Sequence, residues 1–349
     1  MATPSSLIWL VTGRCNLACS HCYAQRFARC RELSAAEAAG LVEEAARAGV
    51  RHLGLAGGEP LLRPDIFDII HRARSMGVGT SLVTNGALVT PRLAMELARE
   101  KVGVAVSLDG ARPETHDHRR GTGSYDEAIR ALSHLKVAGA TYRTVLALGT
   151  DNYQEIEGYL ELAKRLGAQA ACLIPVMASG RARSDMVLAP AQITDTLKET
   201  ARHSKLVRQP VELWCLPFAP LVDASFEVSV SYCRTSRSMD VDPSGNVLLC
   251  DVLDFVVSSA RDKGLVGAWK DQCASRLVRR LGNPKLAPVC AECPLARSCR
   301  GGCFARAKLM SGDLYGPDPL CPRVADSFDP DCGPNGWPVG GLILEEEMR

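Results

Sequence analysis

The residues with the clearest capacity for chemistry are three cysteines near the N-terminus, Cys15, Cys19 and Cys22. An iron-sulfur cube needs four ligands, so three thiolates would leave one iron open to a substrate or cofactor. A zinc site completed by His21 or Cys30, or buried thiols without a metal, would use the same cysteines. Residues 13–33 form a long connection after an apolar run, and that length favours a functional loop.

A second group of cysteines lies in the C-terminal half. Its spacing is Cys233-x11-Gly245-x4-Cys250 and then, after a gap, Cys290-x2-Cys293-x5-Cys299-x3-Cys303-x17-Cys321. The chain has 15 cysteines, an odd number that would leave one thiol over in a fully disulfide-bonded scaffold. The N-terminus has no export-signal pattern, so we expect a cytoplasmic protein with reduced, metal-binding thiols. Two zinc sites remain the alternative for the second group.

Composition excludes several classes of partner. Among 349 residues, 41 Lys and Arg nearly balance 39 Asp and Glu, so no strong field directs the chain to nucleic acid or a membrane surface. The apolar runs are short and interrupted by charge or glycine, which argues against a membrane span. A compact small-molecule or peptide substrate fits this composition better.

Strand and helix patterns alternate from residue 7 to about residue 205. The expected strands cover residues 7–11, 50–56, 78–84, 102–109, 141–148 and 168–175. The helices between them cover residues 34–48, 65–77, 91–101, 124–139 and 152–167, with capping boxes expected at Ser34 with Glu37 and at Ser124 with Glu127. Six β-then-α units predict an α/β fold with a parallel sheet, open or curled into a partial barrel.

The elements place the polar motifs at one end of this sheet. The cysteine loop follows the first strand, Gly-Gly-Glu-Pro at 57–60 the second, Thr-Asn-Gly at 84–86 the third and Ser-Leu-Asp-Gly at 107–110 the fourth. Ligand sites of parallel α/β sheets lie at these carboxyl ends. Past residue 210 the alternation stops and Cys and Pro become frequent, so we expect domains at 1–208 and 209–330 and a tail at 331–349.

The first motif identifies a family. Cys15-x3-Cys19-x2-Cys22 followed by Tyr23, after a first strand, resembles the signature of the radical S-adenosylmethionine (SAM) enzymes. The resemblance implies a partial (β/α)6 barrel and a [4Fe-4S] cluster whose open iron is chelated by SAM. A flavodoxin or ferredoxin would supply the electron that cleaves SAM to methionine and a 5′-deoxyadenosyl radical, which abstracts a substrate hydrogen.

Further motifs resemble the SAM-binding segments of that family. Glu59 and the backbone of its glycine-rich segment would receive the SAM ammonium, Ser107 would approach the carboxylate or ribose, and Arg119 or Arg120 would neutralise the carboxylate. Ordinary turns and solvated arginines are the alternative reading. The implied contacts are Tyr23, Gly57, Gly58, Glu59, Pro60, Asn85, Ser107, Asp109 and Arg119.

The C-terminal cysteines resemble the seven-cysteine SPASM extension, which holds two auxiliary [4Fe-4S] clusters. The resemblance assigns auxiliary cluster II to Cys290, Cys293, Cys299 and Cys321. It assigns auxiliary cluster I to Cys233, Cys250 and Cys303, with Cys215 as the candidate fourth ligand. Without Cys215 that cluster would have an open iron. The thiols left over, Cys30, Cys172, Cys273 and Cys332, are expected to be incidental.

The resemblance leaves several substrates open. We expect a maturase that crosslinks, epimerises or oxidises a peptide or protein side chain. Asp251 could remove the substrate proton, as is thought for sulfatase-maturing relatives, or could be a solvated turn residue. The first strand begins at residue 7 and leaves no room for a leader-binding domain ahead of it. This departure counts against a ribosomal peptide substrate but does not exclude it, since a separate protein could recognise the leader.

Three alternatives to a maturase remain. Residues 299–321 also resemble relatives that decarboxylate or trim tetrapyrrole side chains in alternative haem or haem d1 synthesis. A dehydrogenase or epimerase of sugar natural products is another enzymatic reading. A non-catalytic iron-sulfur electron carrier is disfavoured because it would need neither the Gly-Gly-Glu-Pro segment nor the open-site cysteines.

Overall fold

A single curved sheet organises the molecule. The computed structural model describes residues 3–226, 228–233 and 237–326. Ten strands lie in the order β10-β9-β8-β1-β2-β3-β4-β5-β6-β7, and β8 and β1 to β7 are parallel. The strands are β1 Ser6–Thr12, β2 His52–Gly57, β3 Gly79–Thr84, β4 Gly103–Ser107, β5 Thr141–Leu148, β6 Ala171–Pro175, β7 Val211–Leu213, β8 Ser238–Val241, β9 Asn246–Leu248 and β10 Val256–Ser259.

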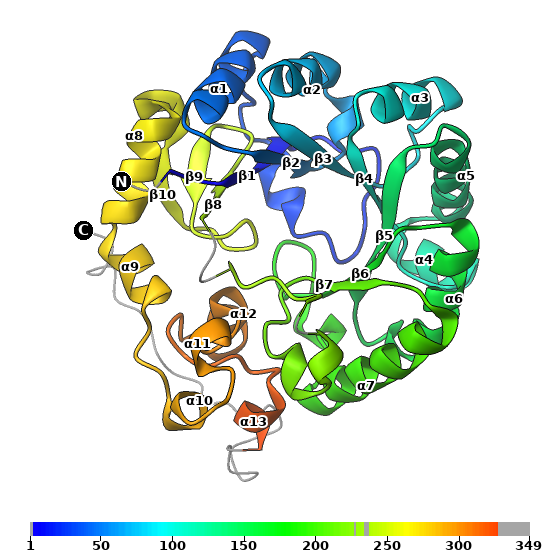
Figure 1. The fold of residues 1–349 in the computed structure, drawn as a ribbon, viewed down its shortest axis with the longest axis vertical. Coiled ribbons are helices and arrows are strands. Elements are labelled where there is room, and N and C mark those ends of the chain that lie inside the picture. The colour runs from blue at the N-terminus through cyan, green and yellow to red at the C-terminus, as the bar shows by residue number, and fades with distance from the viewer. Residues whose placement is uncertain (1–2, 227, 234–236, 327–349) are drawn as a thin grey trace.

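Helices cover the outer face of this sheet, whose strands curl around the middle of the molecule (Figure 1). The helices are α1 Ala35–Arg47, α2 Ile66–Ser75, α3 Pro91–Arg99, α4 Pro113–Arg120, α5 Ser124–Val137, α6 Ile156–Leu166, α7 Pro190–Val207, α8 Ala260–Ala274, α9 Arg276–Gly282, α10 Pro288–Ala291, α11 Ala296–Cys299, α12 Phe304–Ser311 and α13 Pro322–Ala325. The predicted α/β partial barrel is confirmed.

Local sequence explains where the helices begin. Ser34 accepts a hydrogen bond from the backbone of Glu37, whose side chain accepts one from Ser34 N, so the expected capping box opens α1. The second box is wrong. Gly123, with φ of 84°, caps α5, and the Ser124 hydroxyl donates to Gly121 O at 2.7 Å. The capping position is occupied by Gly123, whose positive φ suits glycine, so Ser124 is already the first residue of the helix.

The main core lies between the sheet and its helices. Side chains that alternate along each strand divide between two faces. Leu55, Leu82 and Val104 point outward and pack with the helices in the main apolar cluster. Ala105, Val145 and Cys172 belong to a separate, smaller cluster with Val83, Ile174 and Trp214. The outer face therefore supplies most of the apolar core, and the inner face carries the smaller cluster.

The sheet continues past the expected domain boundary at 208/209. β7 extends it on one side, and β8 pairs with β1 on the other, with Ser6 opposite Ser238. β9 and β10 then run antiparallel. Strands of three or four residues separated by Cys and Pro are too short to give a periodic signal. The added strands bring the second cysteine-rich region against the first.

No helix in the described part of the chain is long and apolar enough to cross a membrane.

Candidate active site

The first cysteine loop runs from the end of β1 to α1 and contains a short 3-10 helix, Ala24–Phe27. Cys15 is exposed, Cys22 is half-buried and Cys19 is buried. Burial raises the pKa of the Cys19 thiol to about 11, and nearby Arg120 partly opposes the shift. Thiolates at these positions therefore need a positive partner. An iron-sulfur cluster supplies that charge, and the three thiols share one loop, so the residues fit such a group.

The Gly-Gly-Glu-Pro segment packs directly on the cysteine loop. Gly58 N donates to Thr12 O and Glu59 N donates to Arg14 O, both at 2.8 Å. A Cβ on Gly58 would lie 2.0 Å from Arg14 O, and Gly57 has φ of 121°. Both positions therefore require glycine, one for close approach and one for its backbone angle.

Glu59 ties the ends of β2 and β3 together. Its carboxylate is fully buried and accepts from the Thr84 hydroxyl at 2.8 Å, from Asn85 N at 2.8 Å and from Leu61 N at 3.2 Å. Burial raises its pKa to about 7, although the three donors favour the charged form. The Asn85 amide nitrogen lies 3.9 Å from Cys15 Sγ. The predicted residues Glu59 and Asn85 therefore lie beside the cysteine loop.

Asp109 is fully buried after β4 and has protein partners. Its carboxylate contacts Arg120 Nε at 2.6 Å and His21 Nε2 at 3.1 Å, and it accepts from Ala147 N at 2.9 Å. Burial opposes ionisation, but Arg120 and His21 hold the pKa of Asp109 well below its usual range. The carboxylate thus links the cysteine loop to β5. Ser107, at the end of β4, is also buried.

The two arginines of α4 face different partners. The Arg119 side chain pairs with Asp151, at 2.8 Å from Nε to Oδ2, and its carbonyl accepts from Ser20 N at 2.8 Å. Arg120 lies with Nη1 3.9 Å from Cys19 Sγ. Arg119 therefore supports the loop through its backbone while its charge is used by Asp151. Arg120 is the arginine beside the cysteines.

A second contact joins the first cysteine loop to the turn that follows β9. The Tyr23 hydroxyl donates to Asp251 Oδ2 at 2.8 Å. Arg26 donates to the carbonyls of Asp251, Val252 and Leu253, the last two at 2.9 and 3.1 Å. Asp251 is therefore held in place from the cysteine loop. No pattern in the sequence indicated Arg26, whose acceptors are these three carbonyls and the Ser179 hydroxyl.

Asp251 also faces a second carboxyl group. Asp251 N donates to Asp240 Oδ2 at 3.1 Å, and both side chains lie within a cluster that includes Cys250. Burial raises the pKa of both aspartates, and for Asp240 the neighbouring Asp251 adds to the shift. Asp240 was missed because a single Asp on a short strand resembles any exposed strand residue.

The cysteines predicted for auxiliary cluster I lie near Asp251 and near one another. Burial raises the pKa of Cys215 well above its usual value, and Cys303 and Cys233 raise it further. The same holds for Cys250, where Asp251, Asp240 and Cys303 add to burial. Cys233 is exposed and precedes residues outside the described part of the chain. Cys303 raises the pKa of both Cys215 and Cys250, so these three thiols lie near one another. Cys215 and Cys303 are 88 positions apart in the sequence. Four thiols in this arrangement fit a cluster.

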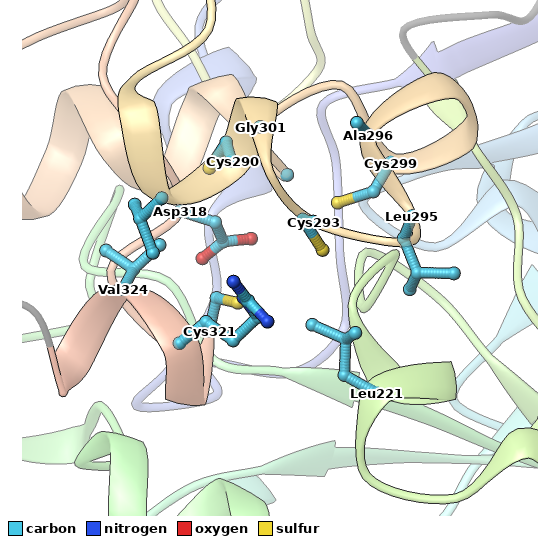
Figure 2. A pocket seen from close by; sticks show the side chains of 13 residues that line it. Leu221, Cys290, Cys293, Leu295, Ala296, Cys299, Gly301, Asp318, Cys321 and Val324 are labelled. Atoms are coloured by element: carbon cyan, nitrogen blue, oxygen red, sulfur yellow. The ribbon is translucent and has the colours of Figure 1, made fainter.

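The cysteines predicted for auxiliary cluster II line one cavity (Figure 2). They are Cys290, Cys293, Cys299 and Cys321, from α10, α11 and the turns beside them and before α13. Apolar side chains such as Leu221 and Val324 form much of the wall. Burial raises the pKa of Cys321 to about 12. Four thiols around one apolar cavity, with Cys321 buried and the other three half-buried, fit an iron-sulfur cluster in donor set and surroundings.

The remaining thiols lie apart from these groups. Cys172 is buried on β6, with Sγ 3.4 Å from Glu212 Oε2. Cys273 is half-buried on α8 and packs against the main core. Cys30 is half-buried at the end of the first cysteine loop. Cys332 lies outside the described residues.

Comparisons with known proteins agree with this geometry. The radical SAM superfamily model matches residues 9–163, and the iron-sulfur cluster-binding SPASM model matches residues 233–294. The chain is 34% identical over 330 residues to the mycofactocin maturase MftC of Mycobacterium tuberculosis. The matched region covers 91% of this chain and 83% of that protein.

Two further relatives differ in kind. The AdoMet-dependent heme synthase of Methanosarcina barkeri is 28% identical over 339 residues, covering 91% of this chain and 96% of that protein. The structure of Streptococcus suis SuiB bound to S-adenosylmethionine matches with a TM-score of 0.75 at 17% identity, covering 92% of this chain and 78% of that one. The last match shows the fold. The chain belongs to the radical SAM superfamily, carries a C-terminal SPASM iron-sulfur domain, and is a radical SAM enzyme.

Proposed function

We propose that the enzyme holds three [4Fe-4S] clusters and modifies a side chain of a peptide or protein. The SAM-binding cluster would use Cys15, Cys19 and Cys22. Auxiliary cluster I would use Cys215, Cys233, Cys250 and Cys303. Auxiliary cluster II would use Cys290, Cys293, Cys299 and Cys321. The donor sets described above support each assignment. We also propose domains at residues 1–208 and 209–330 and a tail at residues 331–349.

When bound, the SAM cluster and SAM together supply a 5′-deoxyadenosyl radical that abstracts hydrogen from carbon. The chain's own residues prepare the site for that chemistry. Glu59 fixes the ends of β2 and β3 beside the open thiols, so that its segment and Asn85 present a rigid cradle to the SAM methionine group. Ser107, Asp109 and the α4 arginines would line the SAM site at the end of β4. Tyr23 would line it from the cysteine loop.

Asp251 is the candidate for moving a proton in the substrate. Tyr23 and Arg26 hold it at the boundary between the SAM-binding loop and auxiliary cluster I. A substrate bound at the inner face of the sheet would lie between these two sites. The raised pKa of Asp251, caused by burial, makes it a stronger base once ionised than an exposed aspartate would be.

The peptide assignment rests on one observation, the 34% identity to a maturase across 91% of this chain. In addition, SuiB, whose fold this chain shares, has been solved bound to a precursor peptide, SuiA. A flavodoxin or ferredoxin is proposed as the electron donor, because the cluster must be reduced before SAM is cleaved.

The direct test is turnover of SAM by anaerobically reconstituted protein with dithionite. We expect 5′-deoxyadenosine from the wild type and at least a 100-fold lower rate from Cys15→Ala, Cys19→Ala or Cys22→Ala, because each removes a ligand of the SAM cluster. Cys30→Ala is the matched control, since it removes a thiol from the same loop without removing a proposed ligand. Full activity in the three ligand variants would refute the assignment.

Iron content tests the number of clusters. Three cubes predict about twelve irons per chain, and two predict about eight. Cys215→Ala, compared with Cys172→Ala, tests the eighth auxiliary ligand. The first variant is expected to lose iron or change the spectrum of auxiliary cluster I, and the second to leave both unchanged.

A tetrapyrrole substrate is the second candidate, favoured by the 28% identity to a heme synthase over 91% of this chain. The two candidates are separated by hydrogen transfer. A pool of uniformly deuterated peptides and an iron porphyrin deuterated in its propionate side chains would be incubated separately with enzyme and unlabelled SAM. Deuterium in 5′-deoxyadenosine from the peptides alone supports a maturase, and from the porphyrin alone it supports the alternative.

A further inference from the structure

A buried ion pair separates the two auxiliary cysteine groups. Arg306 on α12 and Asp318 are each 1% exposed. Arg306 Nε donates to Asp318 Oδ1 at 2.8 Å, and Nη2 donates to Asp318 Oδ2 at 2.5 Å. Two parallel hydrogen bonds of this kind fix both the distance and the orientation of the pair.

The two members of the pair are placed differently with respect to the cysteine groups. Arg306 Nη2 also donates to Cys215 O at 2.9 Å, and its charge acts on the thiols of Cys215 and Cys303. Asp318 lines the cavity of the four other cysteines, where its carboxylate points toward Cys293 and Cys321 (Figure 2). Arg306 therefore lies against auxiliary site I, whereas Asp318 lies between the two sites and contacts auxiliary site I only through Cys303 N, at 2.9 Å.

One donor of the pair has no hydrogen-bond acceptor in the described part of the chain, although the guanidinium lies over the Phe218 ring with Cζ 5.8 Å from its centroid. Arg306 Nη1 is buried without a hydrogen bond, whereas both oxygens of Asp318 accept twice, from Arg306 and from the backbone of Leu320 or Cys303. A buried charged donor without an acceptor costs stability. Anchoring α12 does not require such a donor, so anchoring alone does not explain Nη1. The sulfur atoms of a cluster held by Cys215 and Cys303 would be acceptors of the required kind.

We propose that Arg306 donates from Nη1 to auxiliary cluster I and, with Asp318, makes that cluster easier to reduce than auxiliary cluster II. This inference rests on the cluster assignments of the proposed function. Hydrogen bonds and positive charge near a cluster raise its reduction potential, and negative charge lowers it. The oriented pair thus favours the electron on the cluster nearer Tyr23 and Asp251. Arg306 is a positioning residue, since it acts on the cluster and not on substrate.

The test is a redox titration of the holoenzyme followed by electron paramagnetic resonance. A background with Cys15→Ala, Cys19→Ala and Cys22→Ala leaves only the auxiliary signals. In that background, Arg306→Gln is expected to lower the ratio of reduced to oxidised cluster I at a fixed potential at least tenfold, a shift of about 59 mV for one electron. Asp318→Asn is expected to raise the same ratio for cluster II.

Two controls accompany the titration. Arg297→Gln removes an exposed charge from the same segment and is expected to leave cluster I unchanged. Arg306→Lys retains the charge but loses the forked geometry, so its shift should be smaller than that of Arg306→Gln. If the reduction potential of cluster I were the same with Arg306 and with Arg306→Gln, and both auxiliary clusters were present, the proposed role of Arg306 would be overturned. The cluster assignments would not be affected.

A second measurement needs no substitution and so does not depend on a variant folding. Protein labelled with 15N-arginine is expected to show a 15N coupling to reduced cluster I by pulsed electron paramagnetic resonance, and unlabelled protein to lack it. Absence of the coupling in the presence of a reduced cluster I would overturn the hydrogen bond. Absence of any cluster I signal, with about eight irons per chain, would instead overturn the cluster assignment on which the inference rests.

Discussion

Single buried residues near the carboxyl ends of the strands carry charges that other protein groups already use. Asp109 contacts Arg120 and His21, and the Arg119 guanidinium pairs with Asp151. Their predicted contacts with SAM stay predictions. These ion pairs determine the shape of the site, because each one fixes the first cysteine loop or a loop next to it.

His116 on α4 gives a pH prediction at this scale. It is fully buried, and its Nδ1 accepts from Asp109 N at 3.0 Å, which requires the neutral ring. Burial lowers its pKa to about 4, with Arg120 adding to the shift. Between pH 6.5 and 4 the unfolded chain binds a proton that the folded chain does not. Stability contributed by His116 is therefore complete above pH 6.5 and is lost as the pH falls, by about 2 kcal/mol at pH 5.

Urea unfolding at pH 7.5 and pH 5 measures this effect. His116→Asn can keep the acceptor for Asp109 N but has no proton to gain, so its free energy of unfolding should change less with pH than that of the wild type. His118→Asn, an exposed histidine of the same helix, should follow the wild type. Parallel pH dependence in wild type and His116→Asn would contradict the prediction.

At the scale of elements, the end of β2 is built to touch the cysteine loop. The contact needs glycine at residue 58, where a Cβ would overlap Arg14 O. Gly58→Ala should therefore displace Cys15, destabilise the protein by about 1–3 kcal/mol and lower SAM-dependent activity at least tenfold. Thermal unfolding and the deoxyadenosine assay measure the two effects.

Gly54→Ala, in the middle of the same strand, is the matched control. A Cβ there would meet its nearest atom, Ser81 Oγ, at an ordinary 3.7 Å. It should keep wild-type activity. If Gly58→Ala behaved like Gly54→Ala, the close approach of the two loops would not be what positions the SAM-binding cysteines.

At the scale of the whole molecule, the barrel and the auxiliary region depend on different forces. The sheet, α1 to α3 and α5 to α7 contribute to one large apolar core, which Val324 of α13 also joins. By contrast, α10, α11 and α13 have four residues each. Helices this short do not persist on their own in water. Their stability must come from packing and from the cysteine-bound clusters.

Removal of iron by chelation under oxidising conditions should therefore affect the regions unequally. Amide hydrogen exchange is expected to speed up at least tenfold over residues 288–303, while β2 to β5 retain their protection. The matched comparison is the holoenzyme under the same buffer without chelator. A uniform loss of protection across the barrel would show instead that the clusters hold the whole fold.

Much of this organisation could be predicted from sequence. Alternating strands and helices gave the α/β class, because residue periodicity reports which side of an element is buried. The Ser34 capping box and the start of α3 at Thr90 also follow from local residues. The short strands β8 to β10 could not be predicted, since β8 pairs with β1 across more than 200 residues of sequence, and β9 and β10 are added beside β8.

The sequence by itself determined the chemistry, because metal-binding spacing within a loop is a local property: Cys15, Cys19 and Cys22 are close in any fold. Only the tertiary structure decided which distant groups meet. It placed Asp251 against Tyr23, Arg120 rather than Arg119 beside Cys19, and the Arg306–Asp318 pair between the auxiliary cysteines. Those contacts depend on long-range packing and on the cost of burying unpaired charge, neither of which leaves a periodic pattern in the chain.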